Sequence, residues 1–143
     1  MIKVMRNSDR TYSGCPIIQD ADIEAYLKDG VLPGNTEHQA VPPGKVVRQR
    51  GFWLRPNHRM HHAANLFLIS TDVYAMNVDD FAAQRDLIYC YRSPATRTAY
   101  LGRVETVGEE KRRFLSPLLS GLHDPFDIEA SGLVFVGRVI ATI

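Results

Sequence analysis

Short apolar runs rich in β-branched and aromatic residues dominate the second half of the chain. Turn-rich pieces such as RSPATRT and SGLHDP separate these runs. The runs are Leu66–Ser70, Leu87–Tyr91, Ala99–Val104, Arg112–Leu115 and Leu133–Ile143. Runs of this length, broken by turn residues, are typical of an all-β meander or barrel. Long stretches with the 3.6-residue period of an amphipathic helix are absent, so the pattern predicts a mostly-β fold.

The first half of the chain predicts one short helix, over Asp20–Lys28. Asp20 or Asp22 is expected to cap its first turn, and Gly30 is a natural stop. From Gly30 to Gly44 the chain holds three prolines and three glycines within 15 residues, which predicts a loop.

The remaining segments of the first half complete the expected domain plan. Lys45–Leu54 has the composition of a strand, interrupted at Gly51. The first 13 residues are polar and aperiodic, which predicts a flexible arm over 1–13. Residues 14–143 are then one domain, since 143 residues suit a single hydrophobic core.

Composition narrows the class of protein without naming its function. Hydrophobic residues make up 45% and charged residues 23% of the chain, values that exclude wholesale disorder. The formal charge of +1 argues against a protein that coats nucleic acid with its whole surface. Because the sequence shows neither a signal-peptide pattern nor a membrane-length apolar run, we expect a cytoplasmic protein that does not enter membranes.

A basic segment within residues 45–62 is the first candidate for binding chemistry. It carries five cations and no carboxylate, beside Phe52 and Trp53, and could bind an acidic partner or nucleic acid. The cations are Lys45, Arg48, Arg50, Arg55 and Arg59. The alternative without a binding function is that the segment is a solvated loop and that its two aromatic residues belong to the core. His58, His61 and His62 could hold a metal only against this positive charge, so we expect no metal site.

The other residues with reactive or metal-binding side chains form no recognisable catalytic or metal-binding motif. Cys15 and Cys90 match no zinc or disulfide framework, and Cys90 suits a core strand. The carboxylates Asp79, Asp80 and Asp86 are scattered, as turn residues often are. Phosphate-binding glycine loops and dinucleotide fingerprints are absent from the sequence, so no cofactor is predicted.

Four separated segments share their order and spacing with a known family. They are Ser13–Ile18 with Ile23-Glu24, Asn65–Leu68 running on to Val73–Met76 and Asp86–Ile88, Leu101–Val104 with Lys111-Arg112, and Val136–Ile140. Together they resemble the LexA/UmuD-type self-cleaving serine peptidases. The resemblance implies a LexA/UmuD-like β-barrel or meander domain with one short N-terminal helix. It leaves residues 31–64 as an insertion.

The resemblance also assigns roles to particular residues. Ser13 and Gly14 occupy the cleavage site, Ala75 the position of the nucleophilic serine, and Lys111, 36 positions later, that of the catalytic lysine. The methyl group of Ala75 cannot attack a carbonyl, so the chain as written is inactive by the mechanism of this family. If the sequence is aligned with the family from its C-terminus instead, Lys111 falls outside the active site. It is then only one of the cations in the solvated run KRR. The alanine reflects either natural loss or an engineered change.

These observations leave three functions open. The leading one is an inactive, homodimeric regulatory or DNA-damage-response accessory protein, since 13 residues before the cleavage site cannot hold a helix-turn-helix module. The resemblance implies protein partners such as a polymerase or a recombinase filament. The alternatives are an active self-cleaving peptidase whose serine was replaced by Ala75, and a phage or plasmid protein that binds nucleic acid through residues 45–62.

Overall fold

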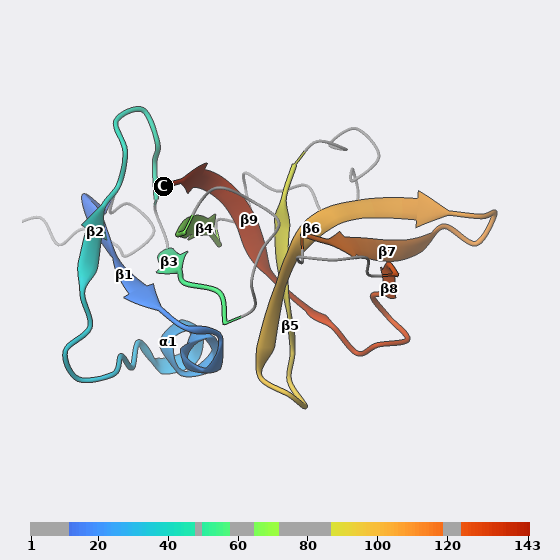
Figure 1. The fold of residues 1–143 in the computed structure, drawn as a ribbon, viewed down its shortest axis with the longest axis horizontal. Helices are drawn as coiled ribbons and strands as arrows, with labels where there is room; N and C mark the ends of the chain where they lie inside the picture. Colours follow the sequence, from blue (N-terminus) through green and yellow to red (C-terminus); the bar gives the residue numbers. More distant parts are fainter. Residues whose placement is uncertain (1–11, 48–49, 58–64, 72–86, 119–123) are drawn as a thin grey trace, which may run out of the picture.

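The computed structural model describes residues 12–47, 50–57, 65–71, 87–118 and 124–143. In this part the chain forms nine strands, one short α-helix and one 3-10 turn (Figure 1). The elements are β1 (Gly14–Ile18), η2 (Asp20–Asp22), α1 (Ile23–Asp29), β2 (His38–Ala40), β3 (Phe52–Leu54), β4 (Phe67–Ser70), β5 (Tyr89–Ser93), β6 (Thr98–Val107), β7 (Arg112–Pro117), β8 (Phe126–Asp127) and β9 (Val134–Thr142). The prediction of a mostly-β fold with one short helix is confirmed.

All nine strands belong to one mixed sheet. Their order is β2-β1-β3-β4-β9-β5-β6-β7-β8, and every pair of neighbours is antiparallel except β1 and β3, which run parallel. The sheet is open, with β2 and β8 at its edges, so it is not a closed barrel. It is also not a simple meander, because β9 inserts between β4 and β5.

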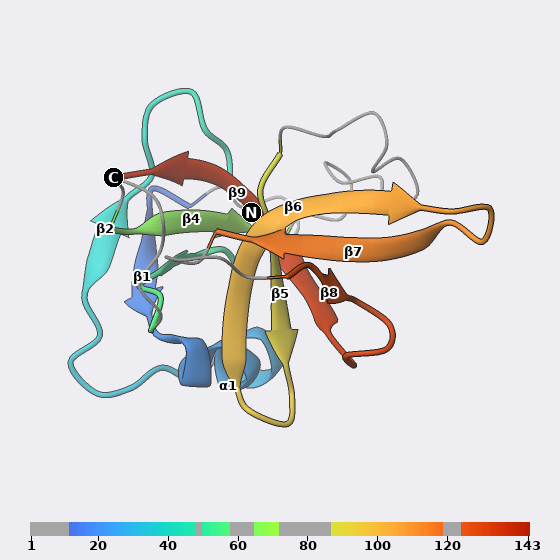
Figure 2. The same cartoon turned by 45° about the vertical axis from the view of Figure 1, so that its right-hand side comes forward.

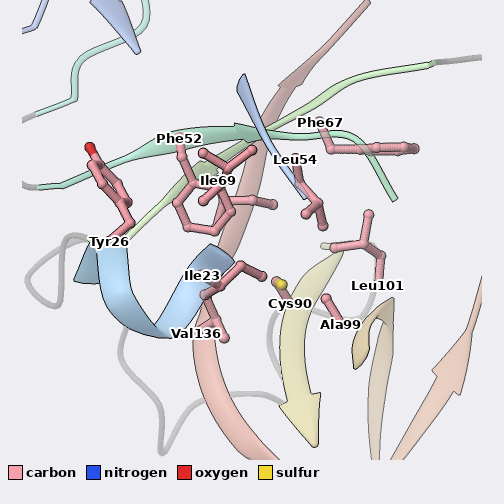
Figure 3. Packing of buried hydrophobic residues seen from close by; sticks show 11 residues of the cluster. Ile23, Tyr26, Phe52, Leu54, Phe67, Ile69, Cys90, Ala99, Leu101 and Val136 are labelled. Carbon is pink, nitrogen blue, oxygen red and sulfur yellow. The ribbon is translucent and has the colours of Figure 1, made fainter. Parts of the chain in front are cut away.

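The sheet folds over a main core that lies under the helix. Side chains from α1 and from six strands meet there. Figure 3 shows this packing, with Phe52, Ile69, Cys90 and Leu101 among the residues. Tyr26 closes this core, since its ring meets Phe52 edge-on at 6.1 Å and its hydroxyl donates to Gly51 O at 2.9 Å. Two smaller clusters form elsewhere, one around Tyr89, Tyr91 and Leu115 and one around Cys15, Trp53 and Leu68. Because side chains on both faces are buried, the inner strands read as continuous apolar runs.

The helix ends as predicted but begins differently. Gly30 adopts a left-handed conformation, φ 70°, and its N–H donates to Tyr26 O at 2.9 Å, which closes the last turn. Arg50 adds two bonds to the carbonyls of Tyr26 and Leu27, at 3.2 and 3.1 Å. The prediction of an aspartate cap is wrong, because neither helical turn receives a side-chain cap bond.

Asp20 points into the fold instead of capping the helix. It is 4% exposed, and its carboxylate accepts the N–H of Ala99 at 2.8 Å and the N–H of Asn57 at 3.2 Å. These two donors come from the start of β6 and from the segment after β3. The carboxylate therefore ties three distant parts of the chain together.

Each of the five predicted apolar runs in the second half contains a strand, but the first half departs from prediction. Within Lys45–Leu54 only Phe52–Leu54 is a strand among the described residues, and the predicted loop Gly30–Gly44 contains the short strand β2. Residues 31–64, predicted as an insertion, therefore contribute β2 and the fully buried β3 to the sheet.

The strands β6 and β7 form a hairpin that extends well beyond the helix-covered core (Figure 2). Its outer residues, from Glu105 to Arg112, are exposed. Two ion pairs tie the return strand to the segment beyond it, joining Arg112 to Asp127 and Arg113 to Glu129. Within the described residues, no helix is long and apolar enough to span a membrane.

Candidate functional site

The cleavage-like pair Ser13-Gly14 lies at the start of β1, inside the hydrogen-bonded sheet. Ser13 O accepts the N–H of Val41 at 2.9 Å, and Gly14 stands opposite Ala40 in β2. One residue earlier, the N–H of Tyr12 donates to Val47 O at 2.9 Å. This part of the expected flexible arm is thus held by the backbone on both sides of the peptide bond, while residues 1–11 lie outside the described part.

The pairing of β1 limits what this peptide bond can do. A peptidase aligns an extended substrate by backbone hydrogen bonds along its cleft. Here β2 pairs with Gly14–Pro16 of β1, while β3 pairs only with Ile17 and Ile18, farther along the strand. Attack on the Ser13 carbonyl therefore competes with the bond that this carbonyl accepts from Val41 N–H.

Lys111, the expected general base, lies in the exposed turn between β6 and β7. Its backbone is left-handed, φ 53°, and its N–H donates to Gly108 O at 3.2 Å. A lysine that serves as a general base is typically held in a buried site, whereas Lys111 is exposed in this turn. The structure thus shows no buried position for this amine.

Ala75, the nucleophile position, lies outside the described residues, so its distance from Lys111 stays a prediction. The two nearest described hydroxyl residues before Ala75 are Thr71 and Ser70. Thr71 donates its hydroxyl to Arg50 O at 3.4 Å, and Ser70 is the buried last residue of β4, opposite Arg138 in β9. Figures 1 and 2 both place β4 well away from the β6–β7 turn. Ser70 and Lys111 therefore do not form a catalytic pair.

The basic segment does not act as one surface in the described part. Arg50 bonds the end of α1, Lys45 lies exposed in the segment after β2, and Arg55 lines a cavity beside η2. Arg48 and Arg59, with the histidines His58, His61 and His62, lie outside the described residues.

The two aromatic residues beside these cations are core residues. Phe52 and Trp53 are fully buried, and the indole N–H of Trp53 donates to Gln39 O at 3.1 Å. Neither ring is available to stack on a nucleic-acid base. The interpretation of this pair as part of the core is confirmed.

Both cysteines are free, buried thiols. Burial raises the pKa of Cys15 to about 11 and raises that of Cys90 further, with the nearby Asp20 carboxylate adding to the second shift. A thiol that keeps its proton at neutral pH is a weak nucleophile. Among the residues that the structure describes, no three His, Cys, Asp or Glu side chains gather to hold a metal ion.

Two features of the structure were not predicted from the sequence. One is Asp20 as a buried link between η2, β6 and the segment after β3. The other is the cavity that Arg55 lines together with two acidic residues, Asp22 and Glu37. Its residues come from three separate segments, and none forms a motif with its sequence neighbours. The cavity forms only because those segments approach one another in the folded chain.

Comparison with known proteins identifies no family for this fold: no family model, curated protein or solved structure matches the chain. The site must therefore be interpreted from its own geometry.

Proposed function

We propose that this chain is a noncatalytic β-domain of the LexA/UmuD-like type that acts by binding, as a homodimeric regulatory or DNA-damage-response accessory protein. The observation that carries the proposal is the state of Ser13-Gly14. The Ser13 carbonyl is already bonded to Val41 N–H, and the residues that follow it, Gly14–Pro16, pair with β2. A segment built into the sheet serves the fold rather than a cleavage cycle.

The two expected catalytic positions support the same conclusion. Ala75 supplies no hydroxyl. Lys111 is exposed at a turn rather than held in a buried site. Replacement of the serine alone would thus leave the lysine unsuited to act as a base.

Among the residues that the structure describes, no strand lies beyond β2 in the sheet, and this outer edge supports binding to a second copy or to a protein partner. Ser13 pairs with Val41 and Ile17 with Glu37 through backbone bonds of 2.9 and 2.8 Å, so alternate residues of the strand face β1. His38 and Ala40 stand between these bonded positions and direct their backbone groups outward. Such an edge can pair with another strand. The resemblance suggests a polymerase or recombinase filament as the further partner.

Restoring the serine tests the noncatalytic part of the proposal. Ala75→Ser is incubated at mildly alkaline pH and analysed by mass spectrometry, with Ala75→Ser/Lys111→Ala as the matched control. We expect an intact chain in both proteins. A Lys111-dependent fragment lacking the first 13 residues would show an active self-cleaving peptidase and overturn the proposal.

A second variant tests whether strand pairing alone blocks cleavage by an otherwise functional catalytic pair. Val41→Pro removes the N–H that binds Ser13 O and so loosens the start of β1. Ala75→Ser/Val41→Pro is also expected to stay intact. Cleavage in this double variant would mean that the catalytic pair is functional and the strand merely protects its substrate.

Light scattering after size-exclusion chromatography tests the binding part. We expect twice the chain mass of 16.1 kDa. Ala40→Pro removes an outward N–H from the β2 edge and should yield monomers, while Ala40→Thr should remain dimeric. A monomeric parent chain contradicts the dimer. Tight, strongly salt-dependent binding to DNA would instead favour the nucleic-acid alternative.

A further inference from the structure

An open cavity of about 340 Å³ lies where β1 leaves the sheet. It is bounded by the end of β1, the start of the helical turns, the segment that leads to β2, and the residue after β3. Figure 1 shows where β1, α1 and β2 lie relative to one another. The lining residues are Ile17–Gln19, Asp22, Pro33–Glu37 and Arg55. The volume lies within the range of small-molecule sites, which begins at about 300 Å³.

Backbone bonds hold the walls of this cavity in place. The N–H of Ile17 donates to Glu37 O at 2.8 Å, and the N–H of Arg55 donates to Ile18 O at 2.9 Å. Asn35 turns the connecting segment through a left-handed conformation, φ 62°. The side chains around the cavity therefore project from a backbone that is already ordered without a ligand.

Three of the lining residues are charged: Asp22 and Glu37 carry carboxylates, and Arg55 carries a guanidinium. In the part of the chain that the structure describes, the ion pairs are Arg92–Glu24, Arg112–Asp127 and Arg113–Glu129, so none of the three takes part in one. A ligand that carries both signs of charge can therefore meet all three.

We propose that this cavity binds a basic α-amino acid, of the arginine or lysine type. The guanidinium of Arg55 offers a two-pronged donor for the α-carboxylate. Asp22 and Glu37 offer acceptors for the α-ammonium group and for the cation of the ligand side chain. Gln19 and Asn35 add amide groups at the rim. The site carries a net charge of −1, which complements the +1 charge of such a ligand.

Other classes of ligand fit this lining less well. A phosphate group would face two carboxylates and only one guanidinium. An apolar ligand would find few apolar side chains, chiefly Ile17, Ile18 and Pro33. A metal ion would need three suitable side chains, and the described residues contain no such group.

Titration of the full chain with L-arginine, followed by two-dimensional NMR of the backbone amides, tests the proposal. We expect saturable shifts at Gln19, Asn35 and Glu37 in the millimolar range or below, and similar shifts with L-lysine. Glycine, which lacks the side-chain cation, should bind more weakly. L-glutamate and inorganic phosphate should not produce these shifts.

Paired variants separate this site from general surface charge. Arg55→Gln and Asp22→Asn should each weaken L-arginine binding about tenfold or more, as loss of a charge-assisted hydrogen bond predicts. Arg103→Gln and Glu105→Gln make the same charge changes at exposed positions of β6, away from the cavity, and should leave binding unchanged. Folding of every variant is visible in the same spectra. No saturable shift in the folded parent, a preference for L-glutamate or phosphate, or equal loss in the β6 controls would overturn the proposal.

Discussion

At the scale of single residues, bonds from side chains to the backbone decide how distant segments meet. Asp20, Arg50 and Trp53 each direct a side-chain donor or acceptor to the backbone of another segment. The bond between Asp20 and Ala99 N–H is buried, so it satisfies a backbone group that lies away from water. The polar side chains that look like surface chemistry in the sequence thus include several that hold the fold together.

Removal of the Asp20 carboxylate should destabilise the domain. Asp20→Ala leaves the N–H groups of Ala99 and Asn57 without this acceptor. A buried donor that loses its partner costs about 1–3 kcal/mol, so we expect the free energy of unfolding to fall by that amount. Urea unfolding followed by the fluorescence of Trp53, the single, buried tryptophan, measures it.

Asp22→Ala is the matched control for this prediction. Asp22 occupies the predicted cap position, yet its side chain makes no cap bond. We therefore expect a change below about 0.5 kcal/mol. Equal losses in the two variants would mean that the buried bonds of Asp20 add nothing beyond the general effect of removing an aspartate here.

At the scale of elements, two glycines allow neighbouring strands to approach closely. A Cβ built on Gly102 in β6 would overlap Ser116 O of β7 and come within 3.0 Å of Pro117 Cα. A Cβ on Gly137 in β9 would similarly overlap Ser70 O of β4. Close backbone approach is a common reason for glycine within a strand.

Gly102→Ala should weaken the junction between β6 and β7. The added methyl group meets backbone atoms, which cannot rotate away as a flexible side chain can. Overpacking of this kind costs about 1–3 kcal/mol. Thermal unfolding should show a lower midpoint for Gly102→Ala than for Gly34→Ala, where a Cβ meets nothing within 4 Å. An unchanged midpoint for Gly102→Ala would show that the strands separate easily at this point.

At the scale of the whole molecule, burial on both faces of the sheet keeps several acidic side chains protonated. Burial raises the pKa of Cys15 to about 11 and, as the main cause, the pKa values of Tyr26 and Tyr91 to about 12. These three groups belong to three different core clusters. The folded state therefore holds protons that the unfolded chain releases at lower pH.

Stability should consequently decrease in alkaline solution. The free energy that these neutral groups contribute is present below about pH 9, where the unfolded thiol also keeps its proton, and declines as the pH rises towards 11. Urea unfolding at pH 7, 9, 10 and 11 should show this decline. Cys15→Ala should show a shallower decline between pH 9 and 11. Identical profiles in both proteins would contradict a buried, protonated Cys15.

Local patterns in the sequence were sufficient for the class of fold and for much of its core. Runs such as Leu87–Tyr91 and Leu133–Ile143 contain strands, because β-branched and aromatic residues suit a sheet buried on both faces. Gly30 ends the helix as expected, since few other residues adopt its left-handed backbone easily. Phe52, Trp53 and Cys90 are buried, as their side chains favour.

Only the tertiary structure decided how these elements meet and which polar side chains come together. The parallel pairing of β1 with β3 and the insertion of β9 between β4 and β5 join segments far apart in the chain. Asp20 leaves the helix cap for Ala99, 79 residues away, because the bond it finds there is buried. The charges around Arg55 likewise gather from three segments. The local pattern of apolar and polar residues indicates which side chains are buried, but it does not indicate which distant segments they contact. The pairing of the strands and the cavity around Arg55 therefore became known only from the tertiary structure.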